Sequence, residues 1–289
     1  AGWARMAIGP WGNSSPTGRM NLILLEPGEI PVDGRVEVSG ARAAHLVRVL
    51  RVESGARVRV GVVDGPRGTA VVEDAADGRV RMSVVLEAAV PERPRVDLLL
   101  ALPRPKVMRR LWAQLAALGV GHVYLTNAAR VERSYFDTHL LSPEVYRPLL
   151  LEGLQQVQDT RLPTVSVHRR FKVFVEDELG PPSDAQLRLA ADPRAAARAG
   201  TLVRDHPAAR VLVAVGPEGG WNAFELALLE AHGCRLAGMG PRTLRTDTAC
   251  VALLALVNDA MPSGPAGRGG RHDPGGEEMV PLTSETCIE

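Results

Sequence analysis

The pattern of apolar and polar positions changes character near residue 90. Before it, short β-branched and partly alternating runs indicate strands at residues 36–38, 58–63, 69–72 and 80–86. Asp64-Gly65 and Asp77-Gly78 are hairpin signals between these runs. A helical segment at residues 41–49 interrupts the strands, with Ser39 as its expected cap. This set predicts a small β-barrel domain over residues 20–90.

Beyond the Pro-rich linker at residues 91–96, continuous apolar runs alternate with helical segments. The runs at residues 96–102, 120–125, 187–191 and 211–215 are typical of strands that are buried on both faces. Residues 107–118 and 144–158 have a helical period. Such alternation predicts an α/β domain with a parallel sheet and right-handed crossovers over residues 97–262.

The two ends of the chain lack this patterning. Residues 1–19 read as an irregular leader without the apolar core of a secretory signal, and Met20 opens the first patterned segment. Residues 263–289 are rich in Gly, Pro and acidic residues, which predicts a disordered tail. No apolar run reaches the roughly 20 residues that a membrane-spanning helix needs.

Composition narrows the class of protein and the cellular compartment in which it is expected. An apolar fraction of 45% allows a sizeable core, and a net charge of +1 gives no global signal for a polyanionic partner. Cys234, Cys250 and Cys287 are too few and too scattered for a disulfide framework or a zinc site, which favours a reduced, cytosolic setting without a metal. Lys106 and Lys172 are the only lysines. That bias fits either a GC-rich genome or the preference of arginine for phosphate.

The residues that could bind a ligand or take part in catalysis are concentrated in residues 211–249, around two Gly-rich turns. The first turn, Gly216-Pro217-Glu218-Gly219-Gly220, lies between a buried strand and a helix that Asn222 and Glu225 would cap as a capping box. Glycines let the backbone approach a ligand closely, and ligands of parallel sheets lie beyond the carboxyl ends of the strands. The turn matches neither a Walker loop nor a Rossmann fingerprint. Taken alone, it is equally well explained as a structural turn.

The second turn, Gly238-Met239-Gly240-Pro241, runs into a crowded polar segment at residues 242–248. The helix expected next, at residues 249–256, is apolar nearly all round, and such a helix is buried on all sides. In a domain of this size, that indicates a subunit interface. Arg245 and Asp247 beside it need partners, either each other or a ligand.

These two segments resemble the GPEGG and LGxRILRTETA signatures of the RsmE family, which are SPOUT-class ribosomal RNA methyltransferases. Residues 45–51 and Asp64-Gly65 resemble the PUA-like RNA-binding domain of that family, and the resemblance covers about residues 20–262. It implies a SPOUT methyltransferase domain with a C-terminal trefoil knot, preceded by a PUA-like barrel. It also implies a cytoplasmic homodimer that uses S-adenosylmethionine to methylate N3 of a uridine in small-subunit (16S) ribosomal RNA.

The resemblance also assigns roles to individual residues. The cofactor-binding residues would be Gly216, Pro217, Glu218, Gly219, Gly220, Leu236, Met239, Gly240, Arg242 and Leu244. The catalytic candidates are Arg245, as a stabiliser of the uridine oxygens or a phosphate, and Asp247 and Glu218, as proton acceptors or orienting groups. The RNA-binding candidates are His45, Arg48, Arg51, Arg130, Arg133, Ser134, Gln156 and Arg161.

Structural roles are the alternatives for several of these residues. Asp247 would form an ion pair with Arg242 or Arg245, Glu218 would accept a hydrogen bond that stabilises the turn, and the surface arginines would be solvated. His45 is expected to pack in the barrel rather than to act in catalysis.

The chain departs from the family pattern at four positions. Gln114 and Ala117 stand where the family usually has Lys and Glu, Asp159 where it has Arg, and Asp247 where it has Glu. Two other functions therefore stay open. One is a catalytically inactive RNA-binding or ribosome-assembly factor of the same fold, and the other is a methyltransferase that acts on a different RNA position.

Overall fold

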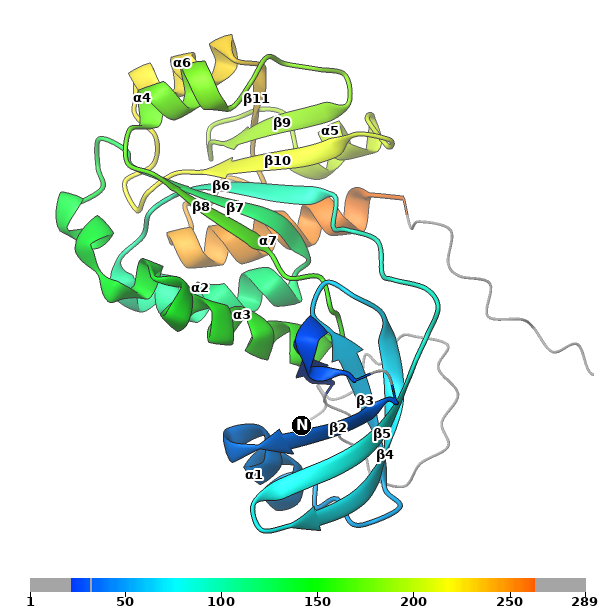
Figure 1. Cartoon of the computed structure of the whole chain (residues 1–289). Coiled ribbons are helices and arrows are strands. Elements are labelled where there is room, and N and C mark those ends of the chain that lie inside the picture. Colours follow the sequence, from blue (N-terminus) through cyan, green and yellow to red (C-terminus); the bar gives the residue numbers. More distant parts are fainter. Residues whose placement is uncertain (1–21, 32, 263–289) are drawn as a thin grey trace, which may run out of the picture.

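Two sheets organise residues 22–31 and 33–262, which are the residues that the computed structural model describes (Figure 1). One sheet has five strands in the order β1-β3-β4-β5-β2, and the other has six in the order β11-β9-β10-β6-β7-β8. The predicted leader and the predicted disordered tail lie outside the described residues.

The five-stranded sheet is antiparallel except for β1, which runs parallel to β3. Its elements are β1 (Ile23–Leu25), β2 (Arg35–Ser39), β3 (Arg57–Val62), β4 (Arg67–Ala76) and β5 (Arg79–Leu86), with the 3-10 turn η1 (Pro27–Glu29) and the helix α1 (Gly40–Arg48). Asp64 and Asp77 take left-handed φ values of 56° and 53° in the two hairpin turns. The predicted hairpins are therefore confirmed. The edge strands β1 and β2 form no ladder with each other among the described residues, so what is observed is a curled sheet.

Helix α1 corrects two expectations. Ser39 does precede the helix, but its side chain makes no capping hydrogen bond. Ala43 and Leu46, three residues apart, form the buried face of α1, whereas His45 is exposed. The expectation that His45 packs in the barrel is wrong, because its helical position points away from the small core.

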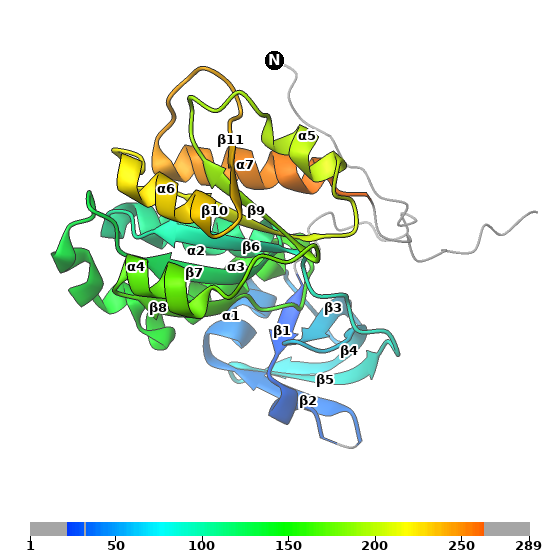
Figure 2. The ribbon, with the colours of Figure 1, turned by 90° about the horizontal axis from the view of Figure 1, so that it is seen from above.

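The six-stranded sheet is parallel in every ladder. Its strands are β6 (Val96–Ala101), β7 (Val120–Thr126), β8 (Thr164–His168), β9 (Gln186–Ala191), β10 (Arg210–Val215) and β11 (Cys234–Ala237). The helices are α2 (Pro105–Ala117), α3 (Pro143–Val157), α4 (Phe171–Val173), α5 (Ala199–Arg204), α6 (Ala223–Ala231) and α7 (Thr246–Ala260), with short turns η2 (Arg133–Asp137) and η3 (His139–Leu141) and the π-helical η4 (Phe174–Glu178). Helices α2, α3 and α7 lie on one side of the sheet, and α4 and α6 lie on the other (Figures 1 and 2).

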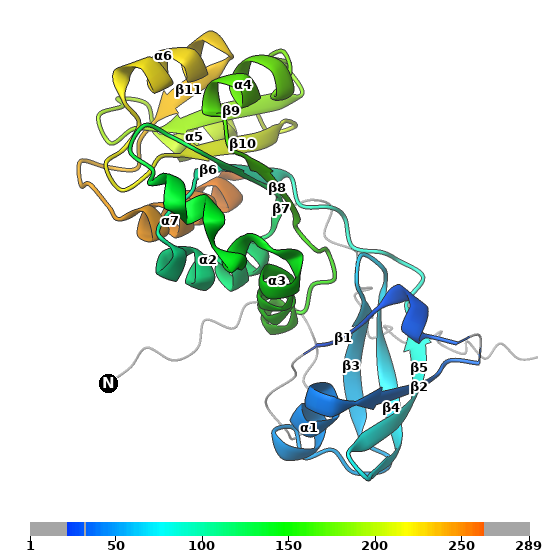
Figure 3. The same ribbon diagram turned by 60° about the vertical axis from the view of Figure 1, so that its left-hand side comes forward.

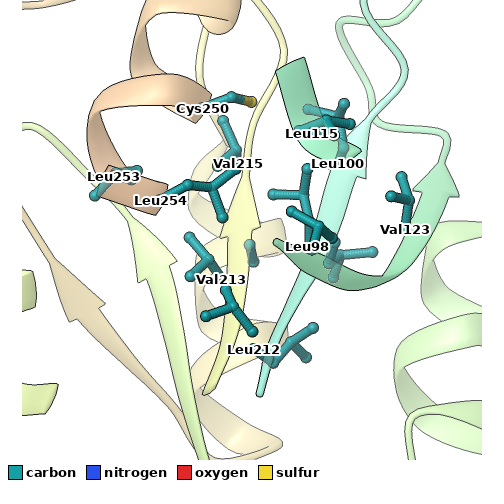
Figure 4. Close-up of a cluster of buried hydrophobic side chains, with 14 of the residues drawn as sticks. Leu98, Leu100, Leu115, Val123, Leu212, Val213, Val215, Cys250, Leu253 and Leu254 are labelled. Carbon is teal, nitrogen blue, oxygen red and sulfur yellow. The ribbon is translucent and has the colours of Figure 1, made fainter. Parts of the chain in front are cut away.

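The centre of the sheet is formed by β6 and β10, whose side chains are buried on both faces. Figure 4 shows Leu98 and Leu100 of β6 beside Val213 and Val215 of β10, with Leu254 of α7 packed against them. The continuous apolar runs predicted such doubly covered strands, and this prediction is confirmed.

Helix α7 begins at Thr246, three residues before the predicted start. The polar residues 246–248 therefore form its first turn. Sequence periodicity also missed α5 and the α4–η4 segment, which are too short to show a clear period, and the four-residue edge strand β11.

The two sheets share a packed junction (Figure 3). Leu22 and Leu24 pack into the core of the parallel sheet, whereas Ile23 and Leu25 pack into the small core. Strand β1 therefore contributes alternate side chains to both units, because successive residues of a strand point to opposite faces. Val96, the last residue of the predicted linker, already belongs to β6.

Candidate functional site

A cavity of about 280 Å³ opens at the carboxyl ends of β9, β10 and β11. Its wall is formed by residues 191–193 after β9, 215–220 after β10 and 237–240 after β11, together with Arg242, Thr243, Leu244 and three residues of α7. Both Gly-rich turns thus meet in one cavity, at the sheet edge where parallel folds bind ligands. Leu236 is the one predicted cofactor residue that does not line it.

The first turn is held in a conformation that requires glycine. Gly220 has a left-handed φ of 69°, and its N–H donates to the carbonyl of Pro217 at 2.7 Å. A Cβ on Gly216 would lie 3.0 Å from the backbone nitrogen of Trp221. The backbone of the turn therefore forms the cavity wall directly, with no side chain in between.

The predicted capping box at the start of α6 is confirmed and extends further than expected. The side chain of Asn222 accepts from the Glu225 N–H at 2.8 Å, and Glu225 Oε2 accepts from the Asn222 N–H at 2.8 Å. Glu225 is buried, and its Oε1 accepts from the N–H of Ala129 at 2.7 Å. One carboxylate therefore joins the turn after β10 to the loop after β7.

Arg130, a candidate for RNA contact, binds the first turn instead. Its guanidinium donates to the carbonyl of Gly219 and, at 3.3 Å, to that of Gly220. Arg133 and Ser134 lie farther along the same loop, on the exposed turn η2. The loop that carries these two candidates is thus attached to the cavity wall.

The second Gly segment passes between neighbouring loops. Gly238 donates to the carbonyl of Ala197 at 2.9 Å and accepts from the N–H of Ala199 at 3.1 Å. A Cβ on Gly238 would lie 3.0 Å from the carbonyl oxygen of Ala195. Gly240 has a φ of 144°, which favours glycine. This segment is therefore packed on both sides before it reaches α7.

Asp192, which sequence reasoning missed, is a buried carboxylate in the cavity wall. Arg194 donates to both of its oxygens, at 3.1 and 3.0 Å, and these hydrogen bonds hold the pKa of Asp192 below its usual range. The signal was present in the sequence, because Asp192 directly follows the buried run at residues 187–191, as Gly216 follows the run at residues 211–215.

Asp247 is paired, but not with the expected partner. Its Oδ2 accepts from Arg110 of α2 at 2.9 Å, and its Oδ1 accepts from the Thr248 N–H at 3.0 Å. The expected ion pair with Arg242 or Arg245 is wrong. Arg245 precedes α7 as its N-cap residue, and its exposed side chain makes no hydrogen bond or ion pair with the described part of the chain.

The remaining predicted RNA contacts divide into exposed and engaged side chains. His45, Arg48 and Arg51 are exposed on α1 or just after it, and Gln156 is exposed on α3. Arg161 instead holds the domain junction. Its Nη1 donates to the carbonyl of Asp64 at 3.0 Å, and its Nε donates to the carbonyl of Pro91.

None of the departures from the family pattern lines the cavity, although Asp247 lies in the first turn of α7, next to Thr246, which does. Gln114 and Ala117 are on α2, and neither lines the cavity wall. Asp159 accepts from the N–H groups of Thr160 and Arg161 and pairs with Arg67 at 3.5 Å. Its role in this chain is therefore at the junction between the two sheets.

Within residues 22–31 and 33–262, no helix is long and apolar enough to cross a membrane. Nor do those residues bring together three or more His, Cys, Asp or Glu side chains that could hold a metal ion.

Comparison with known proteins identifies the class of domain to which the parallel sheet belongs. Residues 91–258 match the family model of the RNA methyltransferase domain, so the parallel sheet and its cavity belong to that class of domain. The similarity to curated relatives extends over nearly all of the described chain. The ribosomal RNA small subunit methyltransferase E of Treponema pallidum is 31% identical over 249 residues, which cover 82% of this chain and 90% of the relative. The chain belongs to the ribosomal RNA small subunit methyltransferase E family.

Two further comparisons agree with this family assignment. The protein of the same name from Synechocystis is 27% identical over 250 residues, covering 83% of this chain and 78% of the relative. The crystal structure of the Neisseria gonorrhoeae protein of this name, bound to S-adenosyl methionine, superposes with a TM-score of 0.70 at 21% identity. That match covers 84% of this chain and 98% of the other, and it shows a shared fold.

Proposed function

We propose that this protein uses S-adenosylmethionine to methylate N3 of a uridine in small-subunit ribosomal RNA, in the cytoplasm. The observation that carries the proposal is the meeting of both family signatures, residues 216–220 and 238–244, in one cavity at the carboxyl end of the sheet. Family membership supplies the class of reaction and substrate.

The residues present fit this cofactor. The cavity combines Gly backbone, which leaves hydrogen-bonding groups within reach of an adenine or a carboxylate, with the apolar side chains of Val215, Leu244 and Leu253. Glu218 and Asp192, the latter already paired with Arg194, add carboxylate acceptors to the lining. When bound, the cofactor supplies an activated methyl group, so the protein has mainly to position the reactants.

The uridine N3 carries a proton that must leave before the nitrogen can act as a nucleophile. Asp247 is already engaged, because Arg110 and the Thr248 N–H each donate to one of its oxygens. Glu218 is exposed on the first turn, and its carboxylate has no hydrogen-bond partner in the described residues. We therefore assign Glu218 as the proton acceptor and Asp247 as the residue that fixes the start of α7.

Arg245 would supply positive charge for the RNA. It stands directly before α7, in the segment that leaves the cavity wall, and its guanidinium is unengaged within the described residues. A guanidinium stabilises the negative charge that develops on the uridine oxygens when N3 loses its proton. Arg133, Ser134 and the exposed residues of α1 would hold flanking phosphates.

The fold proposal includes the PUA-like barrel and a trefoil knot formed by residues 238–260. Two sets of contacts support the proposed knot. The backbone of Gly238 forms hydrogen bonds with Ala197 and Ala199, and the hydroxyl of Thr246 lies 3.5 Å from the carbonyl oxygen of Gly216. The segment therefore contacts both the residues after β9 and the turn after β10 before α7 packs against β6 and β10.

We further propose a homodimer that uses α7. The helix is apolar over most of its length, yet Ala255 is exposed and Leu256 is 41% exposed. Leu256→Arg is expected to shift the protein from the mass of a dimer to the mass of a monomer in sedimentation velocity. The reason is that burying an unpaired charge in a desolvated interface is unfavourable. Val85→Arg, on the 70% exposed Val85 of β5, is the control and should keep the native mass. A monomeric wild-type protein would contradict the proposal.

The cavity wall offers a direct test of cofactor binding. Gly216→Ala is expected to weaken S-adenosylmethionine binding roughly 10- to 100-fold, since overpacking costs about 1–3 kcal/mol. The added Cβ would lie 3.0 Å from the Trp221 nitrogen and displace the turn. Calorimetric titration measures the Kd. Gly28→Ala meets no atom within 4 Å and serves as the control. An unchanged Kd in Gly216→Ala would place the cofactor elsewhere.

The test of the whole function is methyl transfer from labelled S-adenosylmethionine to small ribosomal subunits, followed by nucleoside analysis. Label in 3-methyluridine is the expected result. Label in another nucleoside would show a different RNA target. Binding of RNA without any binding of the cofactor would show an inactive assembly factor.

A further inference from the structure

A second cavity, of about 350 Å³, lies at the opposite end of the parallel sheet, beside the linker between the two sheets. Gln186 and Arg210 line it and open β9 and β10, whose last residues, Ala191 and Val215, line the first cavity. Five steps along a strand, at about 3.3 Å each, separate the two cavities by roughly 17 Å. The second cavity is therefore a distinct place on the molecule.

The lining of this junction cavity is rich in cations. It contains the guanidinium groups of Arg93, Arg161 and Arg210, whereas the nearby carboxylates are Asp97 in the lining and Asp64 beside it. Burial lowers the pKa of His122, so that imidazole is neutral near pH 7. Positive charge thus exceeds negative charge in the cavity.

The local structure of the cavity is specific. The pairing of β6 with β7 shifts register between Val96 and Leu98, an irregularity that leaves Asp97 opposite the Gly121–His122 bend. A Cβ on Gly121 would lie 3.0 Å from Asp97 Oδ1 and 3.4 Å from Arg210 Nη2. Such irregularities re-aim side chains and recur beside functional sites. Here the register shift and the glycine make room for the pair formed by the buried Asp97 and the partly exposed Arg210.

Several donors in the cavity remain available for a ligand. Arg210 uses only Nη2 for Asp97, at 3.0 Å to both oxygens, and its side chain is 45% exposed. Arg93 is 59% exposed and reaches Asp64 only at 3.7 Å. Gln186 is engaged through its Oε1 by Arg188, which leaves its amide hydrogens free to donate. Guanidinium and amide donors that converge on one space are typical of phosphate sites.

A flat ring surface lies in the same lining. The rings of His122 and Tyr124 stack with centroids 3.8 Å apart and planes 3° from parallel. Because the rings of His168 and Phe174 also contact Tyr124, the His122 ring is the one that would stack with a nucleobase, which favours a nucleotide over inorganic phosphate.

We propose that the junction cavity binds the phosphate of a nucleotide, supplied either by a free nucleotide or by an RNA strand. The site goes beyond the proposed methyl transfer, because it shares no residue with the cofactor cavity. A phosphate held there would bind both the linker residue Arg93 and the strand residue Arg210, and so would stiffen the junction between the two sheets.

The test is an NMR titration of the full-length protein, following the backbone amides of Gly121 and Gln186. The probes are inorganic phosphate, uridine monophosphate, unphosphorylated uridine and a short single-stranded RNA. We expect saturable shifts with uridine monophosphate or the RNA, weaker ones with inorganic phosphate, and none with uridine. Saturation by uridine monophosphate identifies a free nucleotide as the source, and saturation by the RNA alone identifies a strand.

Arg93→Gln is the informative variant, because Arg93 is exposed and its loss leaves the Asp97–Arg210 pair intact. It should weaken phosphate binding about tenfold, the effect of one charge-assisted hydrogen bond. Arg235→Gln, on the exposed face of β11, is the charge-matched control and should bind as wild type does. Equal affinity in Arg93→Gln, or no saturable shift with any probe, would overturn the proposal. Either result would leave methyl transfer, which is measured separately, unaffected.

Discussion

Arg188→Met is expected to lower the free energy of unfolding by about 3–5 kcal/mol, because it leaves several buried carbonyls without a donor. Arg188 is 4% exposed in the centre of β9. Its guanidinium donates to the carbonyls of Leu179, Gly180, Pro181 and His232 at 2.9–3.0 Å. Without it, four backbone acceptors lose their donor, and a buried unsatisfied polar group costs about 1–3 kcal/mol.

The arrangement requires arginine in particular. Five N–H groups in a fixed plane can reach four carbonyls and the Gln186 side chain at once, whereas an ammonium group has only three donors. Arg188→Lys should therefore recover little of the lost stability. Burial lowers the pKa of Arg188, because desolvation disfavours the charged guanidinium. The hydrogen bonds to the carbonyls stabilise the charged form in return. The side chain thereby joins the loop before β9 to the end of α6.

Urea unfolding followed by circular dichroism measures this effect. Arg235→Met is the matched control, because Arg235 is exposed on the neighbouring strand β11, and its loss should change stability by less than about 0.5 kcal/mol. A loss below about 1 kcal/mol in Arg188→Met would mean that water replaces the guanidinium at these carbonyls.

Local patterns were enough for the parts of the fold that depend on neighbours in sequence. The apolar runs predicted β6 and β10, the Asp-Gly pairs predicted the hairpins, and the Asn222–Glu225 spacing predicted a capping box that is present atom for atom. In each case the relevant partners lie within a few residues or repeat with the period of the element. The family resemblance, rather than a local pattern, implied that the two Gly turns serve one ligand, and they line one cavity.

Tertiary partners explain what sequence reasoning missed. Asp247 and Arg110 are 137 residues apart, so nothing in the local pattern could replace the nearer Arg245 as the expected partner. Arg161 looked like a surface arginine, yet it binds the carbonyls of Pro91 and Asp64 across the domain junction. Arg188 lies in the run at residues 187–191 that was expected to form a buried strand, and its partners are likewise distant carbonyls. The sequence around an arginine does not indicate whether its N–H groups will bind RNA or the carbonyls of its own chain.

The loop after β7, which carries the proposed RNA contacts, and the first Gly turn are hydrogen-bonded to each other. Arg130 holds the carbonyls of the first turn, and Glu225 holds the loop after β7 through the Ala129 N–H. A change in the position of Arg133 or Ser134 on binding RNA would therefore be transmitted to the cavity wall.

Arg245→Ala is expected to lower turnover about 100- to 1,000-fold, the usual effect of removing one group that stabilises developing charge. The Kd for S-adenosylmethionine should change less than about threefold, because the guanidinium makes no hydrogen bond or ion pair within the described residues, and Arg245 does not line the cavity. The fold should be unaffected, since Arg245 caps α7 through its backbone carbonyl, which accepts from the Ala249 N–H at 2.7 Å.

Two neighbouring variants separate catalysis from structure. Arg242→Ala removes a residue of the cavity wall and should weaken cofactor binding, whereas Arg110→Ala frees Asp247 and should lower the thermal stability of the α2–α7 contact. Single-turnover methyl transfer, calorimetric titration and thermal unfolding distinguish the three effects. If Arg245→Ala lost turnover and cofactor affinity in equal measure, or unfolded at a lower temperature, Arg245 would be a structural residue. Charge stabilisation would then have to come from another cation.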